Sequence, residues 1–363
     1  MNQVVSEKRL RKRILFINPG PFGSLTDTYY YYIHLKEYYD ITHVGFDEGK
    51  EVINYDNIRL IHLNGGSSGL SQKRLFFKKI RELLNSENFD FILINYFIGC
   101  SLIRLFRRKS VVVDVRSSYI FKNKYKRFLY NIILFFEVHF FRNITVISKG
   151  LSNFLHLPGR SHILPLGAPQ FPLVKKKFDS LKILYVGTFC QRNIPNTIFA
   201  FAKFYREHNS KIPMSYTIIG YGSEDDVANI QTAIMTQEMK DHISYIGVIR
   251  YPKLNKYLHD HNVGMSYIPI KNHYEHQPPT KTFEYLLSGM AVIATGTSEN
   301  KKVISDSNGV VINDSIEDIY NGLKEIYIRR LSYDTEKIQK NAKSYSWEEI
   351  VNGNLIPYIE SFN

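Results

Sequence analysis

One short segment carries the residues best suited to chemistry in this chain. Pro279 rigidifies a loop that opens a predicted helix, and we expect the Thr280 hydroxyl to cap that helix. Lys281 and Glu284 follow three positions apart, which makes them neighbours on one helical face. The helix is short and apolar and runs into a glycine and a buried strand, so we expect its charges near a sheet edge. A surface ion pair on an amphipathic helix is the simpler alternative.

Two further loops follow predicted strands and could bind phosphate. In one, Gly187 and Thr188 precede Arg192, and an arginine can clamp a diphosphate through two hydrogen bonds without changing its protonation state. A solvated surface arginine is the alternative. In the other, Gly20 and Gly23 would let the backbone approach a ligand. That loop is not G-x-G-x-x-G, and no acidic residue ends the second strand in the required register, which argues against a dinucleotide site.

A basic and aromatic stretch occupies the middle of the first half of the chain. Residues 101–150 contain eleven Lys/Arg and two acidic residues. A cluster of cations precedes an apolar run at helical spacing, which is typical of an amphipathic helix. Either this is a core helix with a solvated basic start, or it is an interfacial patch for anionic lipid. The cations are Lys122, Lys124, Lys126 and Arg127, and the apolar stripe is Tyr125, Phe128, Leu129, Ile132, Ile133, Phe136 and Phe140.

The composition limits the classes of protein. The chain has 363 residues, a net charge of +13 and 44% hydrophobic residues, which is normal for a globular protein of two domains. Its two cysteines, Cys100 and Cys190, exclude a disulfide framework and a cysteine-based zinc site. No secretory signal is visible, and the longest apolar stretch is shorter than the ~20 residues that span a bilayer. We therefore expect a cytoplasmic protein.

The order of the predicted elements indicates two doubly wound α/β units in tandem. Short apolar runs that read as buried parallel strands alternate with helical patterns in both halves. We expect one domain over residues 1–170, a second over 181–340 and a terminal helix over 341–363 that packs back on the first. The predicted strands are 13–18, 41–45, 58–63, 91–95, 110–114, 144–148, 181–187, 216–220, 243–247, 263–268, 291–295 and 309–312, with helices at 73–85, 124–141, 195–207, 224–236, 252–259 and 280–288.

The chain resembles glycosyltransferases of the GT-B fold, and among these it is most similar to the large retaining family 4. The signature P-x-K-x-F-E-Y-[LM]-x-x-G-x-x-V-I-A of that family is matched by Pro279 through Ala294. Further agreement with the family in the second half includes Val186-Gly187, Ile218 through Gly222 and Asn308-Gly309. In the first half of the chain the agreement is weaker. The resemblance implies two Rossmann-like domains facing across a cleft.

The same resemblance implies roles for the residues above. Glu284 would bind the ribose of a nucleotide-sugar, Arg192 would stabilise charge on the leaving diphosphate, and Lys281 would add to that field or simply pair with Glu284. Asp114, followed by Arg116, would contact the acceptor or the transferring sugar, although a structural Asp–Arg pair is equally consistent. The other residues expected to bind the donor are Gly20, Gly23, Gly187, Thr188, Gly220, Gly247, His276, Pro279 and Thr280.

The sequence departs from the family pattern at two places. The E-x7-E motif requires glutamate at position 276, where this chain has His276, with Glu275 one residue away. Many members have arginine directly after the domain-opening glycine, where this chain has Thr188. The position of the donor sugar and the strength of the diphosphate clamp are therefore in question. His273 and His276 are candidate substitutes for the missing donor contact.

These observations lead to one main hypothesis and two rivals. The main hypothesis is a metal-independent glycosyltransferase that uses a UDP- or GDP-linked sugar, needs no other cofactor, and acts on a lipid-linked or glycan acceptor in cell-surface polysaccharide synthesis. We expect it to be peripheral on the inner face of the cell membrane. The first rival is a degenerate GT-B protein that binds a nucleotide-sugar or glycan without turnover. The second is a basic nucleic-acid-binding protein, but no signature of such a module accompanies the charge, so we expect no nucleic-acid partner.

Overall fold

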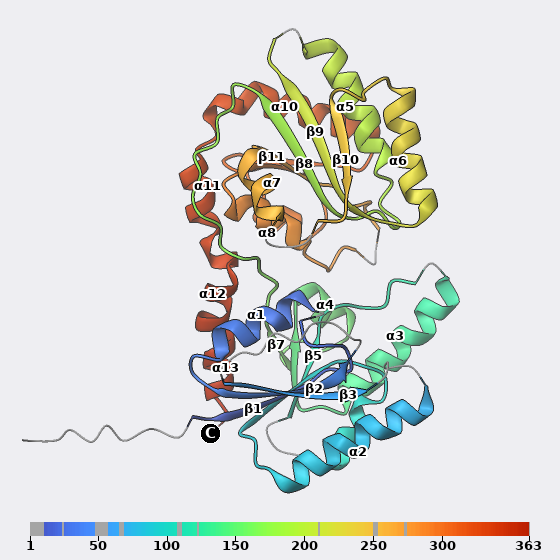
Figure 1. The fold of residues 1–363 in the computed structure, drawn as a ribbon, viewed down its shortest axis with the longest axis vertical. Coiled ribbons are helices and arrows are strands. Elements are labelled where there is room, and N and C mark those ends of the chain that lie inside the picture. The colour runs from blue at the N-terminus through green and yellow to red at the C-terminus, as the bar shows by residue number, and fades with distance from the viewer. Residues whose placement is uncertain are drawn as a thin grey trace, which may run out of the picture. The chain divides into compact units, whose positions relative to one another are not determined.

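The computed structural model describes residues 11–23, 25–47, 57–64, 69–106, 111–121, 123–209, 211–249, 253–271 and 274–362. The chain divides into two compact units. The first unit contains Met1–Pro165 together with Ile350–Asn363, and the second contains Leu166–Glu349. Each unit is a parallel sheet with helices on its faces (Figure 1). The expectation of two doubly wound Rossmann-like units is confirmed.

The first unit is built on a seven-stranded parallel sheet with the order β3-β2-β1-β4-β5-β6-β7. The outward growth of the sheet from β1 in both directions is the doubly wound arrangement. The central strands are buried throughout, as parallel strands covered on both faces must be. Its strands are β1 (Arg13–Ile17), β2 (Asp40–Asp47), β3 (Ile58–Asn64), β4 (Phe91–Asn95), β5 (Val111–Val115), β6 (Asn143–Val146) and β7 (Ser161–Ile163).

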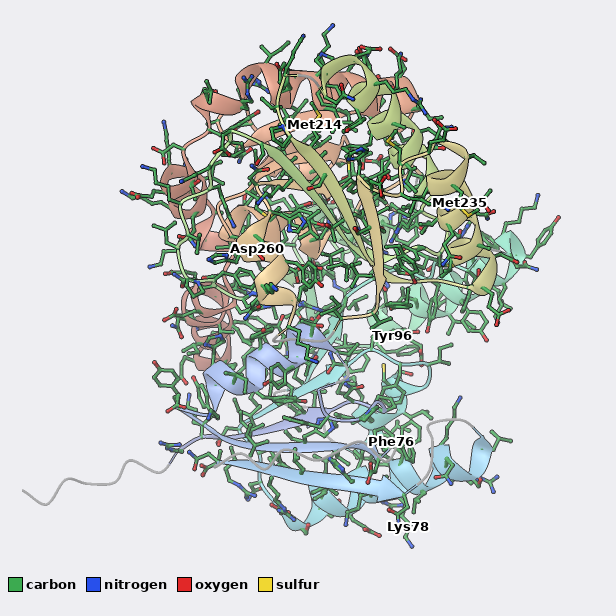
Figure 2. The ribbon with its side chains drawn as sticks, turned by 45° about the horizontal axis from the view of Figure 1, so that its top comes forward. Phe76, Lys78, Tyr96, Met214, Met235 and Asp260 are labelled. Atoms are coloured by element: carbon green, nitrogen blue, oxygen red, sulfur yellow. The ribbon has the colours of Figure 1, made fainter. Side chains whose placement is uncertain are left out.

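The helices of the first unit bury one side against this sheet. The sequence analysis did not predict α1, because its four consecutive tyrosines favour a strand by propensity. In the structure Tyr31 and Tyr32 are buried on one side of the helix. On α2, Phe76 is buried while Lys78 is exposed (Figure 2). Asn123 caps α3 by accepting hydrogen bonds from two backbone N–H groups. The helices are α1 (Thr26–Leu35), α2 (Leu70–Ser86), the 3-10 helix η1 (Cys100–Leu105), α3 (Lys124–His139) and α4 (Lys149–Phe154).

The second unit repeats the plan with six parallel strands in the order β10-β9-β8-β11-β12-β13. The strands are β8 (Leu181–Thr188), β9 (Met214–Tyr221), β10 (Ile243–Gly247), β11 (Val263–Ser266), β12 (Ala291–Thr295) and β13 (Gly309–Ile312). The helices between them are α5 (Pro195–His208), α6 (Glu224–Thr236), α7 (Leu254–Asp260), α8 (Thr280–Leu287) and α9 (Asn300–Val303), followed by α10 (Ile316–Arg329), η2 (Arg330–Ser332), α11 (Thr335–Ala342) and η3 (Lys343–Tyr345).

The last residues of the chain return to the first unit. They form α12 (Trp347–Ile350), the π-helical turn η4 (Val351–Leu355) and α13 (Ile356–Glu360). Glu360 accepts hydrogen bonds from Lys12 and from the Tyr39 hydroxyl, both at 2.6 Å. The ring of Tyr358 stacks on His162 with centroids 4.1 Å apart. The C-terminal segment is therefore held against the first sheet by polar and aromatic contacts.

The backbones at the carboxyl ends of β8 and β9 approach so closely that glycine is required there. Gly187 and Gly220 both have positive φ, at 147° and 152°. A Cβ atom at position 220 would lie 1.8 Å from the carbonyl oxygen of Gly187, which no side chain can tolerate. Gly353, in η4, has nothing within 4 Å of its Cβ position.

We expect Gly220→Ala to lower the free energy of unfolding by at least about 2 kcal/mol, because the neighbouring strand must move. Gly353→Ala should be neutral within about 0.5 kcal/mol. Denaturant unfolding of both variants measures the difference. Equal stability of the two variants would contradict the contact between the strand ends.

Candidate functional site

The candidate donor site lies at the carboxyl edge of the second sheet. Gly187 and Thr188 end β8, Gly220 lies near the end of β9, and Gly247 ends β10. These three strands are neighbours and parallel, so their carboxyl ends meet at one edge of the sheet. Ligands of doubly wound proteins bind at this edge. The structure therefore brings together four of the residues that the sequence predicted.

Lys281 is half-buried, and its ammonium group lies beside the end of β8. A Cβ atom at Gly187 would lie 2.9 Å from Nζ of Lys281, so the glycine leaves the space that this side chain needs. The ammonium lies over the ring of Tyr185, 3.9 Å from its centroid. Burial and, to a smaller extent, the nearby charge of Arg192 together lower the pKa of Lys281 to about 7, although the charge of Glu284 opposes this shift.

Arg192 lies in a tightly constrained loop after β8. The residues on either side of it, Gln191 and Asn193, have positive φ values of 57° and 51°. Its guanidinium lies over the ring of Tyr274, 4.0 Å from the centroid. Its Nη1 atom is buried and has no hydrogen-bond partner among the described residues. A buried donor of this kind is costly unless an acceptor satisfies it, which is consistent with an anion binding beside the guanidinium.

Helix α8 presents the residues of the signature and is anchored to the sheet. The Tyr285 hydroxyl accepts a hydrogen bond of 2.8 Å from the backbone N–H of Val186. Glu284 is half-buried on the same helix, close enough to raise the pKa of Lys281. The predicted cap is wrong: Pro279 occupies the capping position, and Thr280 is the first, exposed residue of the helix. The helix still begins at Thr280, as the sequence predicted.

The position of the missing glutamate is occupied differently from the family pattern. Oε2 of Glu275 accepts hydrogen bonds from the backbone N–H and the hydroxyl of Ser298, at 2.9 and 2.6 Å. Glu275 thus joins its loop to the segment after β12. His276 is half-buried in the same loop, and His273 lies outside the described residues.

In the first unit, Asp114 is part of a buried network. Its Oδ1 atom accepts hydrogen bonds from the Thr145 hydroxyl at 2.6 Å and from Arg116 at 3.4 Å. Arg116 also donates to Asp27 and to the Tyr31 hydroxyl. Burial raises the pKa of Asp114, and with the opposing charge of Arg116 included the pKa is about 6. With 1% of its surface exposed, Asp114 fits the structural Asp–Arg pair better than a contact to substrate.

The loop of Gly20 and Gly23 follows β1 in the first unit. The backbone N–H of Gly20 donates to Oδ1 of Asn18 at 2.9 Å, and Gly23 has a positive φ of 76°. The carbonyl oxygen of Gly20 lies 2.5 Å from the position of a Cβ atom at Gly45, so the loop lies close against β2. Only glycine at position 45 permits this path.

The stripe on α3 is not the side of the helix that faces the core. Leu134 and Val138 are the buried residues of α3. Phe128, by contrast, is 67% exposed and Phe136 is 60% exposed. The interpretation of this stripe as core is therefore wrong. Lys124 and Lys126 are exposed and Arg127 is half-buried, whereas Lys122 lies outside the described residues.

Two residues of the candidate site could not be found from the sequence. Tyr185 and Tyr274 place their ring faces under Lys281 and Arg192. Nothing in the sequence pattern distinguishes them from the other tyrosines, of which the chain has 26 in all.

In the described parts of the chain there is no helix long and apolar enough to cross a membrane. Those same residues contain no group of three or more His, Cys, Asp or Glu that could hold a metal ion.

A comparison with known protein families covers the part of the chain that contains this site. Residues 180–328 match the family model described as glycosyl transferases group 1, and this range includes the whole donor-site cluster. No curated protein is matched by sequence. The resemblance of the second unit to glycosyltransferases, predicted from the signature, is confirmed.

Solved structures of GT-B glycosyltransferases share the fold over almost the whole chain. A glycosyltransferase from Rickettsia africae has a TM-score of 0.74 at 13% identity, covering 97% of this chain and 98% of its own. Sucrose-phosphate synthase from Thermosynechococcus elongatus has a TM-score of 0.74 at 16% identity, covering 97% and 99%. The Anabaena protein HepE, in complex with UDP and glucose, has a TM-score of 0.70 at 12% identity, covering 97% and 100%. The fold is that of the GT-B glycosyltransferases.

The lowered pKa of Lys281 predicts that binding of a diphosphate depends on pH. An anion favours the charged ammonium, so binding takes up a proton wherever the free lysine is neutral, above pH 7. We expect the affinity for a nucleotide-sugar to fall about tenfold between pH 6.5 and 8.5. Calorimetry in buffers of different ionisation enthalpy measures the proton uptake directly.

The control is Lys281→Met, which should bind the nucleotide-sugar more weakly and without this dependence on pH. A nucleotide-sugar is the suitable ligand because both of its phosphates are esterified and do not titrate in this range. Retention of the full pH dependence in the variant would show that another group titrates.

Proposed function

We propose that this protein is a glycosyltransferase that moves a sugar from a UDP- or GDP-linked donor to a lipid-linked or glycan acceptor in cell-surface polysaccharide synthesis. The observation that carries the proposal is the pair of cations at the carboxyl edge of the second sheet. Lys281 and Arg192 lie over tyrosine rings, and the Nη1 donor of Arg192 lacks a partner among the described residues. Two cations held in this way suit a ligand with two adjacent negative charges, such as a diphosphate.

The chemistry follows from where charge develops. The bond between the anomeric carbon of the sugar and the diphosphate oxygen breaks, and its electron pair stays on the diphosphate. Lys281 and Arg192 would stabilise that charge from fixed positions, which costs no reorganisation during the reaction. The acceptor hydroxyl forms the new bond to the anomeric carbon and loses its proton. Glu284, on the same helix as Lys281, would accept hydrogen bonds from the ribose hydroxyls and place the nucleotide.

The finer parts of the proposal rest on different support. Retention of configuration and independence of metal and other cofactors rest on the resemblance to family 4 alone. A nucleotide donor is supported by the Anabaena relative of the same fold, which was solved with UDP and glucose. Peripheral attachment to the inner face of the membrane is supported by α3, where exposed Lys124 and Lys126 accompany the exposed ring of Phe128.

A binding protein without turnover is the second candidate. The observation that favours it is the loop before α8, where His276 replaces the expected glutamate and Glu275 is engaged with Ser298. Such a protein would bind a nucleotide-sugar and release no nucleotide diphosphate. Release of nucleotide diphosphate upon incubation with a panel of donors and extracted membrane lipids decides between the two.

Glu284→Gln tests the ribose contact. We expect the dissociation constant of the nucleotide-sugar to rise about ten- to a hundredfold, because a hydrogen bond to a charged group contributes ~1.5–3 kcal/mol. Glu317→Gln is the matched control: Glu317 lies on the exposed start of α10, where it pairs with Lys203. Calorimetric titration of both variants gives the comparison. Unchanged affinity in a folded Glu284→Gln variant would rule out the assignment.

Arg192→Gln tests the diphosphate contact. If the guanidinium mainly stabilises charge on the leaving group, kcat should fall by about a hundredfold or more while KM for the donor changes little. Arg206→Gln, on the exposed side of α5, should leave both constants unchanged. Steady-state assays of nucleotide diphosphate release measure them. A rise in KM alone would instead assign Arg192 to binding of the ground state.

A further inference from the structure

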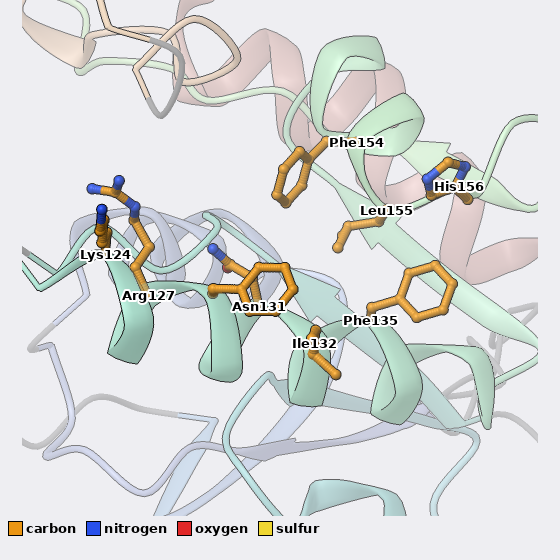
Figure 3. Close-up of a pocket in the computed structure, with 9 residues that line it drawn as sticks. Lys124, Arg127, Asn131, Ile132, Phe135, Phe154, Leu155 and His156 are labelled. Carbon is orange, nitrogen blue, oxygen red and sulfur yellow. The ribbon is translucent and has the colours of Figure 1, made fainter.

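The first unit contains a groove that none of the proposed steps uses. It runs between α3 and the end of α4 and has a volume of about 540 Å³ (Figure 3). This volume lies within the roughly 300–1,000 Å³ that small-molecule sites occupy. Ile132 and Phe135 line it from α3, and Phe154 and Leu155 line it from α4 and the residue after it.

The groove is cationic at one end and apolar along its length. Figure 3 shows Lys124 and Arg127 together at one end, whereas Phe135 and His156 lie at the other. Between these ends lie Ile132 on α3 and, on the other side of the groove, Phe154 and Leu155. A ligand complementary to this lining has an anionic group at one end and a hydrocarbon chain behind it.

The apolar walls are exposed to an unusual degree. Phe128, which also lines the groove, is 67% exposed, and Phe154 is 44% exposed. Leaving apolar surface in water is unfavourable relative to burying it. Exposed apolar surface gathered in one place marks a site for a ligand, a membrane or another protein. A hydrocarbon chain in the groove would cover these rings.

The cationic end lies on the side of the unit where ligands of such sheets bind. Helix α3 begins at Lys124, after the connection from the carboxyl end of β5. Lys124 and Arg127, in the first turn of that helix, therefore lie toward the carboxyl edge of the sheet. Doubly wound proteins place their ligands outside that edge.

We propose that this groove holds the acceptor, and that the acceptor is a lipid phosphate. The phosphate that joins the chain to the sugar-accepting end would lie against Lys124 and Arg127, and the first part of the hydrocarbon chain would lie against Ile132, Phe135 and Leu155. This rests on the proposed function, and it selects a lipid-linked acceptor over a free glycan.

Two pairs of nearby residues allow an experiment to distinguish binding in the groove from attraction to a diffuse basic patch. Lys126 carries the same charge as Lys124 two residues away but does not line the groove; its ammonium lies 4.5 Å from the centroid of Phe121. Phe136 is exposed and adjacent to Phe135, and it also does not line the groove. Attraction to a charged surface would treat the members of each pair alike, whereas binding in the groove would not.

The experiment is a calorimetric titration of the full chain with dodecyl phosphate below its critical micelle concentration. We expect one molecule to bind per chain. Lys124→Gln should weaken binding about fivefold and Phe135→Ala about tenfold, while Lys126→Gln and Phe136→Ala should stay within about twofold of the unchanged chain. Inorganic phosphate and a neutral detergent with the same chain should bind at least about tenfold more weakly than dodecyl phosphate. Thermal unfolding of each variant confirms that it is folded.

Several results would overturn the proposal. Equal weakening by Lys124→Gln and Lys126→Gln would show a diffuse patch, and equal binding of inorganic phosphate would show a site for a free anion. Equal binding of the neutral detergent would show that the cations play no part. Self-association of the chain that dodecyl phosphate does not reverse would show that a second copy covers the groove.

Nucleotide-sugar binding, measured on the same samples, separates this proposal from the proposed function. Phe135→Ala should bind the donor like the unchanged chain, because Phe135 lies in the other unit from Lys281 and Glu284. Donor turnover with no binding of dodecyl phosphate would refute the groove alone. Binding of dodecyl phosphate by a chain that binds no nucleotide-sugar would refute the proposed function and, with it, the role of the groove as an acceptor site.

Discussion

The candidate donor site depends on the absence of a side chain at two neighbouring strand ends. The carbonyl of Gly187 occupies the space where Gly220 would carry a Cβ atom, and Nζ of Lys281 lies close to the space where Gly187 would carry one. Burying an ammonium group is costly unless other groups compensate. The ring face of Tyr185 and the charge of Glu284 offset part of this cost. The hydrogen bond from the backbone N–H of Val186 to the Tyr285 hydroxyl anchors α8, which carries Lys281 and Glu284, to the sheet.

The same arrangement leaves the site electrostatically incomplete in the absence of a ligand. Lys281 and Arg192 are close enough that each cation disfavours the other, which contributes to the low pKa of Lys281. The loop of Arg192 also holds Gln191 and Asn193 at positive φ, a conformation that costs free energy for residues other than glycine. An anion between the two cations would remove the repulsion and satisfy the unused donor of Arg192. The charges of the two cations and the unused donor thus both favour a state with an anionic ligand bound.

The sequence predicted the scaffold well because parallel strands and glycine-bounded turns have local signatures. The strands at 91–95, 243–247, 291–295 and 309–312 are found with the predicted bounds. The signature also placed Lys281 and Glu284 on one short helix at the sheet edge. Helix α1 was missed because the tyrosine run carries no helical period in residue type; only burial against β1 and β2 distinguishes its two sides. Tyr185 and Tyr274 were missed because a cation–π contact across the fold leaves no mark in local sequence.

Helix α3 shows where periodicity stops being informative. Spacing predicted an apolar stripe, and the stripe exists, but a helical period cannot say what covers it. Leu134 and Val138 face the sheet, so α3 is apolar on a second side as well, and that second side is exposed. A surface helix that needed only to pack on its own sheet would carry polar residues there. Of the exposed rings on this helix, Phe128 lines the groove together with Lys124 and Arg127, and an amphiphilic ligand there would cover it. Lys124 and Arg127 at the start of α3, and the apolar residues that follow them along the groove, then serve one ligand.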